Sequence, residues 1–185
     1  EMGFRTLECR ALSRIGSVYH YQGENEGFQK ATTEALAIGR EIRNAGLIAT
    51  CLGALGDISE IAGDYEQALG YFQENLRLTT ELGQSRKRSI VLSNVGRMHQ
   101  VLGRQEAALV CYREALTIAR ATSDRLTEAF TLATIAQVFE VQGNISSAID
   151  TSKEALAILQ DLNHKRGLAL VLAAIGGMYA VLEDF

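Results

Sequence analysis

Proline and tryptophan are absent from the 185 residues, and cysteine occurs only three times. Three cysteines do not make a disulfide framework, so we expect a reducing compartment and a cytoplasmic location. Glycine, by contrast, occurs 17 times. Because alanine and leucine are also abundant, the composition indicates helices joined by short glycine-containing turns and favours no strands.

A strong charge of either sign is also missing. The 18 Lys and Arg against 22 Asp and Glu give a net charge of −4, which argues against a nucleic-acid module that binds by bulk charge. The longest uncharged run, residues 167–182, falls short of the roughly 18 to 20 residues that a membrane span needs. We therefore expect neither nucleic-acid nor membrane binding.

The sequence does contain a unit of 40 residues that recurs without insertions or deletions. Positions 40 residues apart, called a column here, share glycine or leucine: Gly16, Gly56, Gly96 and Gly176; Gly23, Gly63, Gly103 and Gly143; Leu12, Leu52, Leu92, Leu132 and Leu172. About 4.5 copies fit the chain. They are residues 5–44, 45–84, 85–124 and 125–164, with a half copy at 165–185, all within one domain.

Within a copy, apolar residues recur three and four positions apart, which predicts helices with one apolar face. In the second copy this pattern predicts helix A near residues 46–61 and helix B near residues 65–81. Gly63 suits the left-handed end of helix A, and Asp64 with Gln67 predicts a capping box for helix B. Asn144 predicts a similar cap in the fourth copy. We expect nine helices in all.

The glycines in the middle of helix A need an explanation, because each costs about 1 kcal/mol relative to alanine. Gly56 and Gly96 lack a side chain where helix B crosses. We therefore expect the two helix axes to approach closely there. The helix B positions expected at this contact are Ala68, Ala108 and Ala148.

These residues resemble the tetratricopeptide repeat family, in the pattern Leu52-x-x-Leu55-Gly56-x-x-Ser59 followed by Ala68-x-x-x-Phe72. The resemblance covers essentially the whole chain. It implies an all-α, right-handed solenoid of tandem helical hairpins. The 40-residue unit is similar to the longer-helix class found in kinesin light chain and in bacterial peptide-responsive regulators.

The chain departs from that family at two places. In the first copy Phe28 replaces the alanine of the other copies and Thr32 replaces the aromatic residue, so we expect looser or locally shifted packing there. The proline that often ends helix B in the family is missing throughout. Its place is taken by Arg40, Thr80, Arg120 and Gln160.

Residues for catalysis or metal binding do not form a recognisable pattern. No His-x-x-x-His, Cys-x-x-Cys or glycine-rich phosphate loop occurs. We therefore expect no enzyme activity, no metal and no cofactor. The basic run Arg86-Lys87-Arg88 is interpreted as a solvated turn.

In the resembled family helix A lines a concave groove that holds a peptide or partner protein. Asn94 coincides with the place where members of the longer-helix class use asparagine to hold a peptide backbone, and Arg97 lies one turn on, where it suits a carboxylate. A plain solvated face is the competing interpretation. The candidate groove residues are Asn94, Arg97, Arg14, Asp57, Glu60, Gln100, Gln137 and Glu140.

The last predicted helix carries apolar residues on every side, and the sequence ends before a helix B that would cover it. We expect an uncovered end face that forms a homodimer or stacks end to end. Its candidate residues are Leu170, Val171, Met178 and Val181. The same feature suggests that the chain is an excerpt of a longer array or of a multidomain protein.

Two classes of function follow from this organisation. The first is a scaffold that binds a peptide or a partner protein segment along the concave helix A face, within a larger signalling or regulatory protein. The second is an assembly module that joins protomers through the terminal helix. A regulatory sensor arm for an attached enzyme or transcription-factor domain is a further alternative, which rests on analogy with the bacterial relatives.

Overall fold

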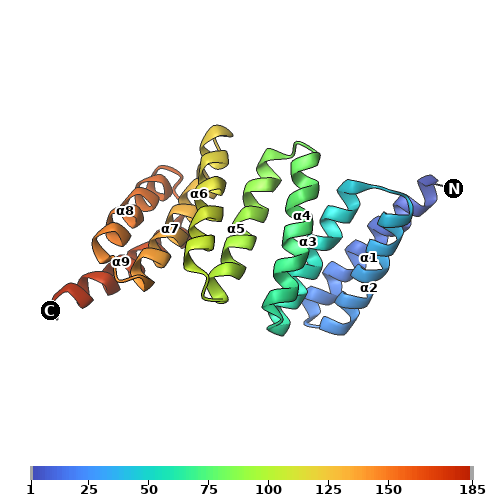
Figure 1. The fold of residues 1–185 in the computed structure, drawn as a ribbon, viewed down its shortest axis with the longest axis horizontal. Coiled ribbons are helices and arrows are strands. Elements are labelled where there is room, and N and C mark those ends of the chain that lie inside the picture. The colour runs from blue at the N-terminus through green and yellow to red at the C-terminus, as the bar shows by residue number, and fades with distance from the viewer. Residues whose placement is uncertain (1, 184–185) are drawn as a thin grey trace.

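The computed structural model describes residues 2–183, which form nine consecutive α-helices in an elongated array (Figure 1). The described residues contain no strand, which confirms the all-α helical solenoid. The helices predicted for the second copy lie within one residue of the observed bounds. The nine helices are α1 (Met2–Gln22), α2 (Asn25–Glu41), α3 (Ala45–Ala62), α4 (Tyr65–Glu81), α5 (Ser85–Val101), α6 (Gln105–Ala121), α7 (Arg125–Val141), α8 (Ile145–Asp161) and α9 (Lys165–Glu183).

Every turn between helices contains one residue with a left-handed backbone. Within each hairpin this residue is a glycine with φ between 75° and 85°, namely Gly23, Gly63, Gly103 and Gly143. Between hairpins φ is 50° to 64°, and the residues are Arg43, Gly83, Ser123 and Asn163. Only glycine adopts this conformation without a Cβ penalty, which explains why the glycine column marks the turns inside the hairpins.

The predicted helix caps are partly correct. The Asn144 side chain accepts a hydrogen bond from the Ser147 backbone N–H at 3.4 Å, as expected. The capping box at Asp64 is wrong, because the Asp64 side chain makes no cap hydrogen bond. Gln67 instead accepts a hydrogen bond from the Ser59 hydroxyl at 2.9 Å, and so links α4 to α3.

The atoms nearest to Gly56 and Gly96 belong to aromatic rings of the second helix, which the sequence did not suggest. A Cβ at Gly56 would lie 2.5 Å from Cε1 of Phe72, and a Cβ at Gly96 would lie 2.7 Å from Cε1 of Tyr112. Both rings are fully buried. The space left by each glycine is therefore filled by the ring of the second helix, which fixes how the two helices of the hairpin cross.

The first hairpin shows the expected local shift. Thr32 takes the place of the ring, and Phe28, one turn earlier on α2, covers Gly16 instead. A Cβ at Gly16 would lie 3.1 Å from Thr32 Oγ1 and 3.2 Å from Phe28 Cδ2. This contact is less tight than those at Gly56 and Gly96, so α1 and α2 meet through a ring placed differently.

Arginines stand at two of the positions where the family often has proline. Arg40 pairs with Glu74 at 3.2 Å, and Arg120 pairs with Glu154 at 3.4 Å. In both pairs the partner lies on the second helix of the next repeat. These pairs are largely exposed, so each contributes only about 0–1 kcal/mol.

The array curves toward its first helices, α1, α3, α5, α7 and α9. Direct contacts join α1 to α3, α5 to α7 and α7 to α9. Among the described residues no two second helices share a contact of comparable extent. Except between α3 and α5, first helices of successive repeats are thus closer together than second helices, so the first-helix face is the concave one.

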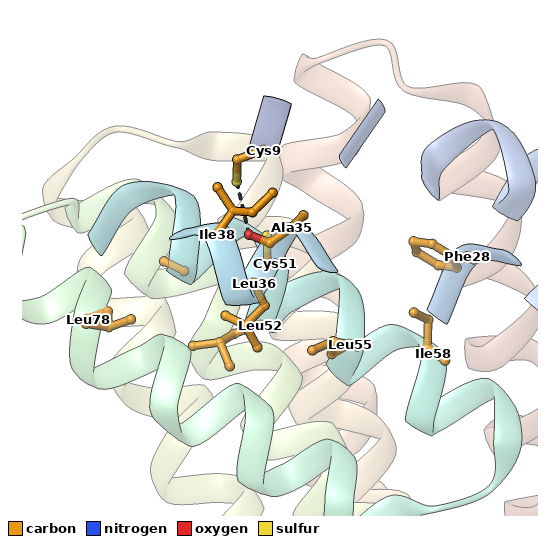
Figure 2. Packing of buried hydrophobic residues seen from close by; sticks show 11 residues of the cluster. Cys9, Phe28, Ala35, Leu36, Ile38, Cys51, Leu52, Leu55, Ile58 and Leu78 are labelled. Carbon is orange, nitrogen blue, oxygen red and sulfur yellow. Dashed lines mark hydrogen bonds between the residues drawn. The ribbon is translucent and has the colours of Figure 1, made fainter. Parts of the chain in front are cut away.

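Helix α3 lies inside this array. By length and composition alone it is apolar enough to cross a membrane, with a mean hydropathy of 1.4. It packs between α2 and α4, as a core helix of a repeat array does. Figure 2 shows Leu52 and Leu55 of α3 in the core, with the Cys9 thiol donating to the Ala35 carbonyl at 3.2 Å.

The glycine–ring contact predicts opposite effects for one substitution at two places in the same column. Gly56→Ala places a Cβ against Phe72 and is expected to lower the free energy of unfolding by about 1–3 kcal/mol through overpacking. Gly176→Ala meets nothing within 4 Å and is expected to raise it by up to about 1 kcal/mol through helix propensity. Urea unfolding of both variants measures the difference, and changes of equal sign would contradict the contact.

Candidate functional site

A hollow of about 540 Å³ lies on the concave face between α1, α3 and α5; we call it the N-terminal hollow. Three predicted groove residues from three successive repeats line it, namely Arg14, Asp57 and Asn94. Other positions along the same helices contribute hydroxyl groups: Ser13, Ser17 and Thr50. The structure therefore brings together side chains that are about 40 residues apart in sequence.

Arg97 and Glu60 lie beside this hollow and form an ion pair that links α5 to α3. Arg97 also donates a hydrogen bond from Nη2 to Oδ1 of Asn94 at 3.4 Å. Burial lowers the pKa of the Arg97 guanidinium, while the nearby Asp57 acts in the opposite direction. Arg97 is thus a partner of Glu60 that positions Asn94, and the Asn94 amide nitrogen remains the donor available to a ligand.

Asp57 is the acidic residue of the N-terminal hollow. Its side chain is exposed to solvent, yet the groove walls partly desolvate the carboxyl and raise its pKa above the ordinary value of 3.8, although Arg97 and His20 partly offset this effect. Such a shift means that the ionised carboxylate is less stable in the fold than in the unfolded chain. The ionised Asp57 therefore lowers the stability of the folded chain at neutral pH only slightly, because solvent screens its exposed charge.

The remaining predicted groove residues do not join this site. Gln100 accepts a hydrogen bond from the Tyr112 hydroxyl at 3.0 Å, so its side chain belongs to the scaffold. Gln137 lines a separate hollow of about 220 Å³, which also includes Phe130 and Leu170; we call it the C-terminal hollow. Glu140 lines neither hollow.

The predicted end face on α9 needs a correction. Val171 and Met178 are buried in the core against the preceding repeat, so they do not form an exposed face. The side chain of Val181 lies outside the described residues. Among the described side chains of α9, the large apolar ones that are exposed are Leu170, Leu172 and Tyr179.

Sequence reasoning missed the residues that the second helices contribute to the N-terminal hollow. Thr32 of α2 and Asn75 and Thr79 of α4 form its floor, and Lys87, assigned to a solvated turn, lines it as well. The prediction took groove residues from the first helices only, and these three residues lie on second helices. The signal was present in the repeat columns, because Asn75 stands where the other copies have Ala35, Ala115 and Ala155.

A metal site has no support in the part of the chain that the structure describes. No group of three or more His, Cys, Asp or Glu side chains is close enough there to hold an ion. The side chains that line the N-terminal hollow offer hydrogen-bonding groups and single charges.

The pKa shift of Asp57 predicts how a charge-removing variant behaves. Because the folded pKa is raised, stability is lost as the pH rises from below 3.8 through the folded value. Asp57→Asn should therefore raise the melting temperature at pH 7 and have less effect at pH 3. Asp64→Asn, on an exposed turn, is the charge-matched control. Thermal unfolding at both pH values measures the effect, and an equal gain in the two variants would contradict it.

Comparison with known proteins agrees with this architecture. A sequence model of the tetratricopeptide repeat family matches residues 87–161, and a second model of the same family matches residues 50–85. Together the two models cover more than half of the chain. A search of curated proteins gave no significant match.

Solved structures share the fold at low sequence identity. BtubC from P. vanneervenii is 17% identical with a TM-score of 0.82, over 100% of this chain and 84% of its own. A signal transduction ATPase with a tetratricopeptide repeat sensor from Pyrococcus horikoshii is 18% identical with a TM-score of 0.88, over 95% of this chain. RapI in its apo form is 21% identical with a TM-score of 0.83, over 89% of this chain.

This chain spans 28% of the Pyrococcus ATPase and 60% of RapI, so it matches only part of either protein. The likeness shows the shared helical array and nothing about their activities. The repeat columns, the stacked hairpins and the two family matches lead to one conclusion. The chain belongs to the tetratricopeptide repeat family of protein-interaction scaffolds.

Proposed function

We propose that the chain binds an extended segment of a partner protein along the concave face of α1, α3 and α5. The observation that carries this proposal is the N-terminal hollow of about 540 Å³, to which three successive repeats each supply a polar residue. A hollow built by three repeats matches a chain that crosses several helices in turn. A face kept polar only for solubility would not need a shared hollow.

The chemistry of the hollow suits a peptide. An extended segment presents unpaired N–H and C=O groups along its length, and Asn94 offers an amide for them. Arg14 and Lys87 line the same hollow and suit carboxylates of the segment. The ion pair between Glu60 and Arg97 holds Asn94 from the neighbouring repeat. The site is thus organised before the ligand arrives, which lowers the entropy lost on binding.

The setting that we propose is regulatory and cytoplasmic. The Pyrococcus relative is described as a signal transduction ATPase with a tetratricopeptide repeat sensor. By analogy, binding in the groove of this chain would be passed to domains attached to the array. The three cysteines are free thiols, two of them buried, in keeping with a reducing compartment.

A random heptapeptide library displayed on phage, selected on the full 185-residue chain, tests the proposal. Peptides selected by the native chain should bind Asn94→Ala/Arg97→Ala at least tenfold more weakly, a loss of about 1.4 kcal/mol or more. The control is Arg77→Ala, which removes an exposed arginine paired with Glu81 on α4. Isothermal titration measures the affinities and circular dichroism checks the fold. Equal binding by both variants would refute the groove.

A second candidate function is assembly through α9. Leu170 is 60% exposed and Leu172 is 52% exposed. Gly176 and Gly177 have nothing within 4 Å, in contrast to the glycines that rings cover in the inner repeats. The helix therefore presents an apolar surface of the kind that joins subunits.

If α9 joins two copies, Leu170→Glu/Leu172→Glu should convert a dimer to a monomer without changing peptide binding in the N-terminal hollow. Light scattering after gel filtration, over a hundredfold range of concentration, measures the mass. The exposed Leu7→Glu on α1 is the control for added charge. A native chain that stays monomeric over the whole range would exclude this candidate.

A further inference from the structure

Asn75, in the floor of the N-terminal hollow, is a polar residue at a position where the other repeats have alanine. The column of Asn75 contains Ala35, Ala115 and Ala155, and each of these alanines is fully buried. Asn75 itself is only 6% exposed. The other repeats show that alanine packs well at this place, so packing does not explain the polar side chain. Local violations of a repeated pattern mark functional positions.

The Asn75 amide is buried without its full set of partners. Its Oδ1 has no hydrogen-bond partner among the described residues, and neither does Oγ1 of Thr32 beside it in the floor. Gly53 leaves the Asn75 amide accessible from the hollow, because it has no Cβ. A Cβ at this position would lie 3.1 Å from Nδ2 of Asn75. Buried polar atoms are nearly always paired. Two orphaned atoms in one hollow therefore point to a ligand group that pairs with them.

Apart from Thr32, whose hydroxyl is unpaired, the hydroxyl groups around the floor donate their protons within the protein. Ser13, Ser17, Thr50 and Thr79 each donate to a carbonyl one turn earlier in their own helix, at 2.9 to 3.1 Å. These hydroxyl oxygens therefore present lone pairs to a ligand and act as hydrogen-bond acceptors. The wall of the hollow is thus rich in acceptors, and it requires a ligand group that carries N–H or O–H donors.

The charged side chains around the hollow restrict which donor group of a ligand can bind there. Arg14 and Lys87 outnumber Asp57 in the lining, while Glu60 and Arg97 neutralise each other beside it. An ammonium or guanidinium group would be repelled, and a carboxylate would bring no donor for the acceptor wall. A neutral primary carboxamide brings two N–H donors and one acceptor, so it pairs with the Asn75 amide whichever way that amide is turned.

We propose that the floor of the N-terminal hollow is a subsite for a carboxamide side chain, Gln or Asn, of the bound segment. Asn75 forms paired amide–amide hydrogen bonds with it, Thr32 adds a further contact, and Gly53 leaves room for its entry. This assignment rests on the proposed function, because it names the side chain that the peptide groove selects.

The same phage library tests the subsite. Peptides selected by the native chain should share Gln or Asn at one position, and replacement of that residue by Glu or Met should weaken binding at least tenfold. Asn75→Ala should remove this preference and weaken the carboxamide peptides at least tenfold. It should also raise the melting temperature of the free chain by about 2–4 °C, because a buried and unpaired carbonyl oxygen is removed. Gln73→Ala, on the exposed face of α4, removes an amide elsewhere and should change neither measurement.

The outcomes separate the two proposals. Peptides that lose affinity with Asn94→Ala/Arg97→Ala, yet show no carboxamide preference or bind Asn75→Ala equally well, overturn the subsite and leave the groove standing. Asn75→Ala that lowers the melting temperature without changing affinity shows a structural role and also overturns it. A library from which the native chain selects no peptide overturns the groove and the subsite together.

Discussion

The contact between a mid-helix glycine and an aromatic ring sets the geometry of the two inner hairpins, α3–α4 and α5–α6, from which the array extends in both directions. Gly56 receives Phe72, and Gly96 receives Tyr112, each at a distance that leaves no room for a Cβ. Because the ring lies between the two helices of a hairpin, it decides how they cross and which face of the first helix stays open. The penalty of about 1 kcal/mol for each glycine is offset by the burial of a complete ring.

The same column also explains where the hollows occur. Rings fill it in the two inner hairpins, whereas Thr32 and Ser152 hold it in the first and fourth. Thr32 lies in the N-terminal hollow and Ser152 lies in the C-terminal hollow. A hollow therefore forms where a small hydroxyl side chain replaces the ring. In the first hairpin Phe28 restores part of the lost packing, so the space opens toward the concave face without separating α1 from α2.

The period of the sequence could predict the fold because a solenoid repeats its contacts. Turn glycines and apolar columns fix the helix bounds within a residue or so, and this information is present in every copy. Side-chain direction was harder to predict. Helix α9 has apolar residues on every side, so its sequence pattern does not show which side faces the core. Val171 and Met178 were therefore predicted to be exposed, whereas both are buried. The hollow's first-helix residues followed from the family geometry, but Asn75 lies on a second helix, which that geometry treats as an outer wall.

A repeat array can contain a locally destabilised site such as the N-terminal hollow and still fold. Stability is a sum over repeats and their interfaces, so a local cost at one junction leaves the other hairpins intact. The N-terminal hollow concentrates several such costs: the unpaired Asn75 Oδ1, worth about 1–3 kcal/mol, a partly desolvated Asp57, and the absence of a ring at Thr32. Two of them, Asn75 and Asp57, lie in the hairpin of α3 and α4, which the contact between Gly56 and Phe72 holds together. A ligand that pairs Asn75 and Thr32 would recover part of these costs on binding, so the free energy that the fold gives up in the N-terminal hollow becomes available for recognition of a partner.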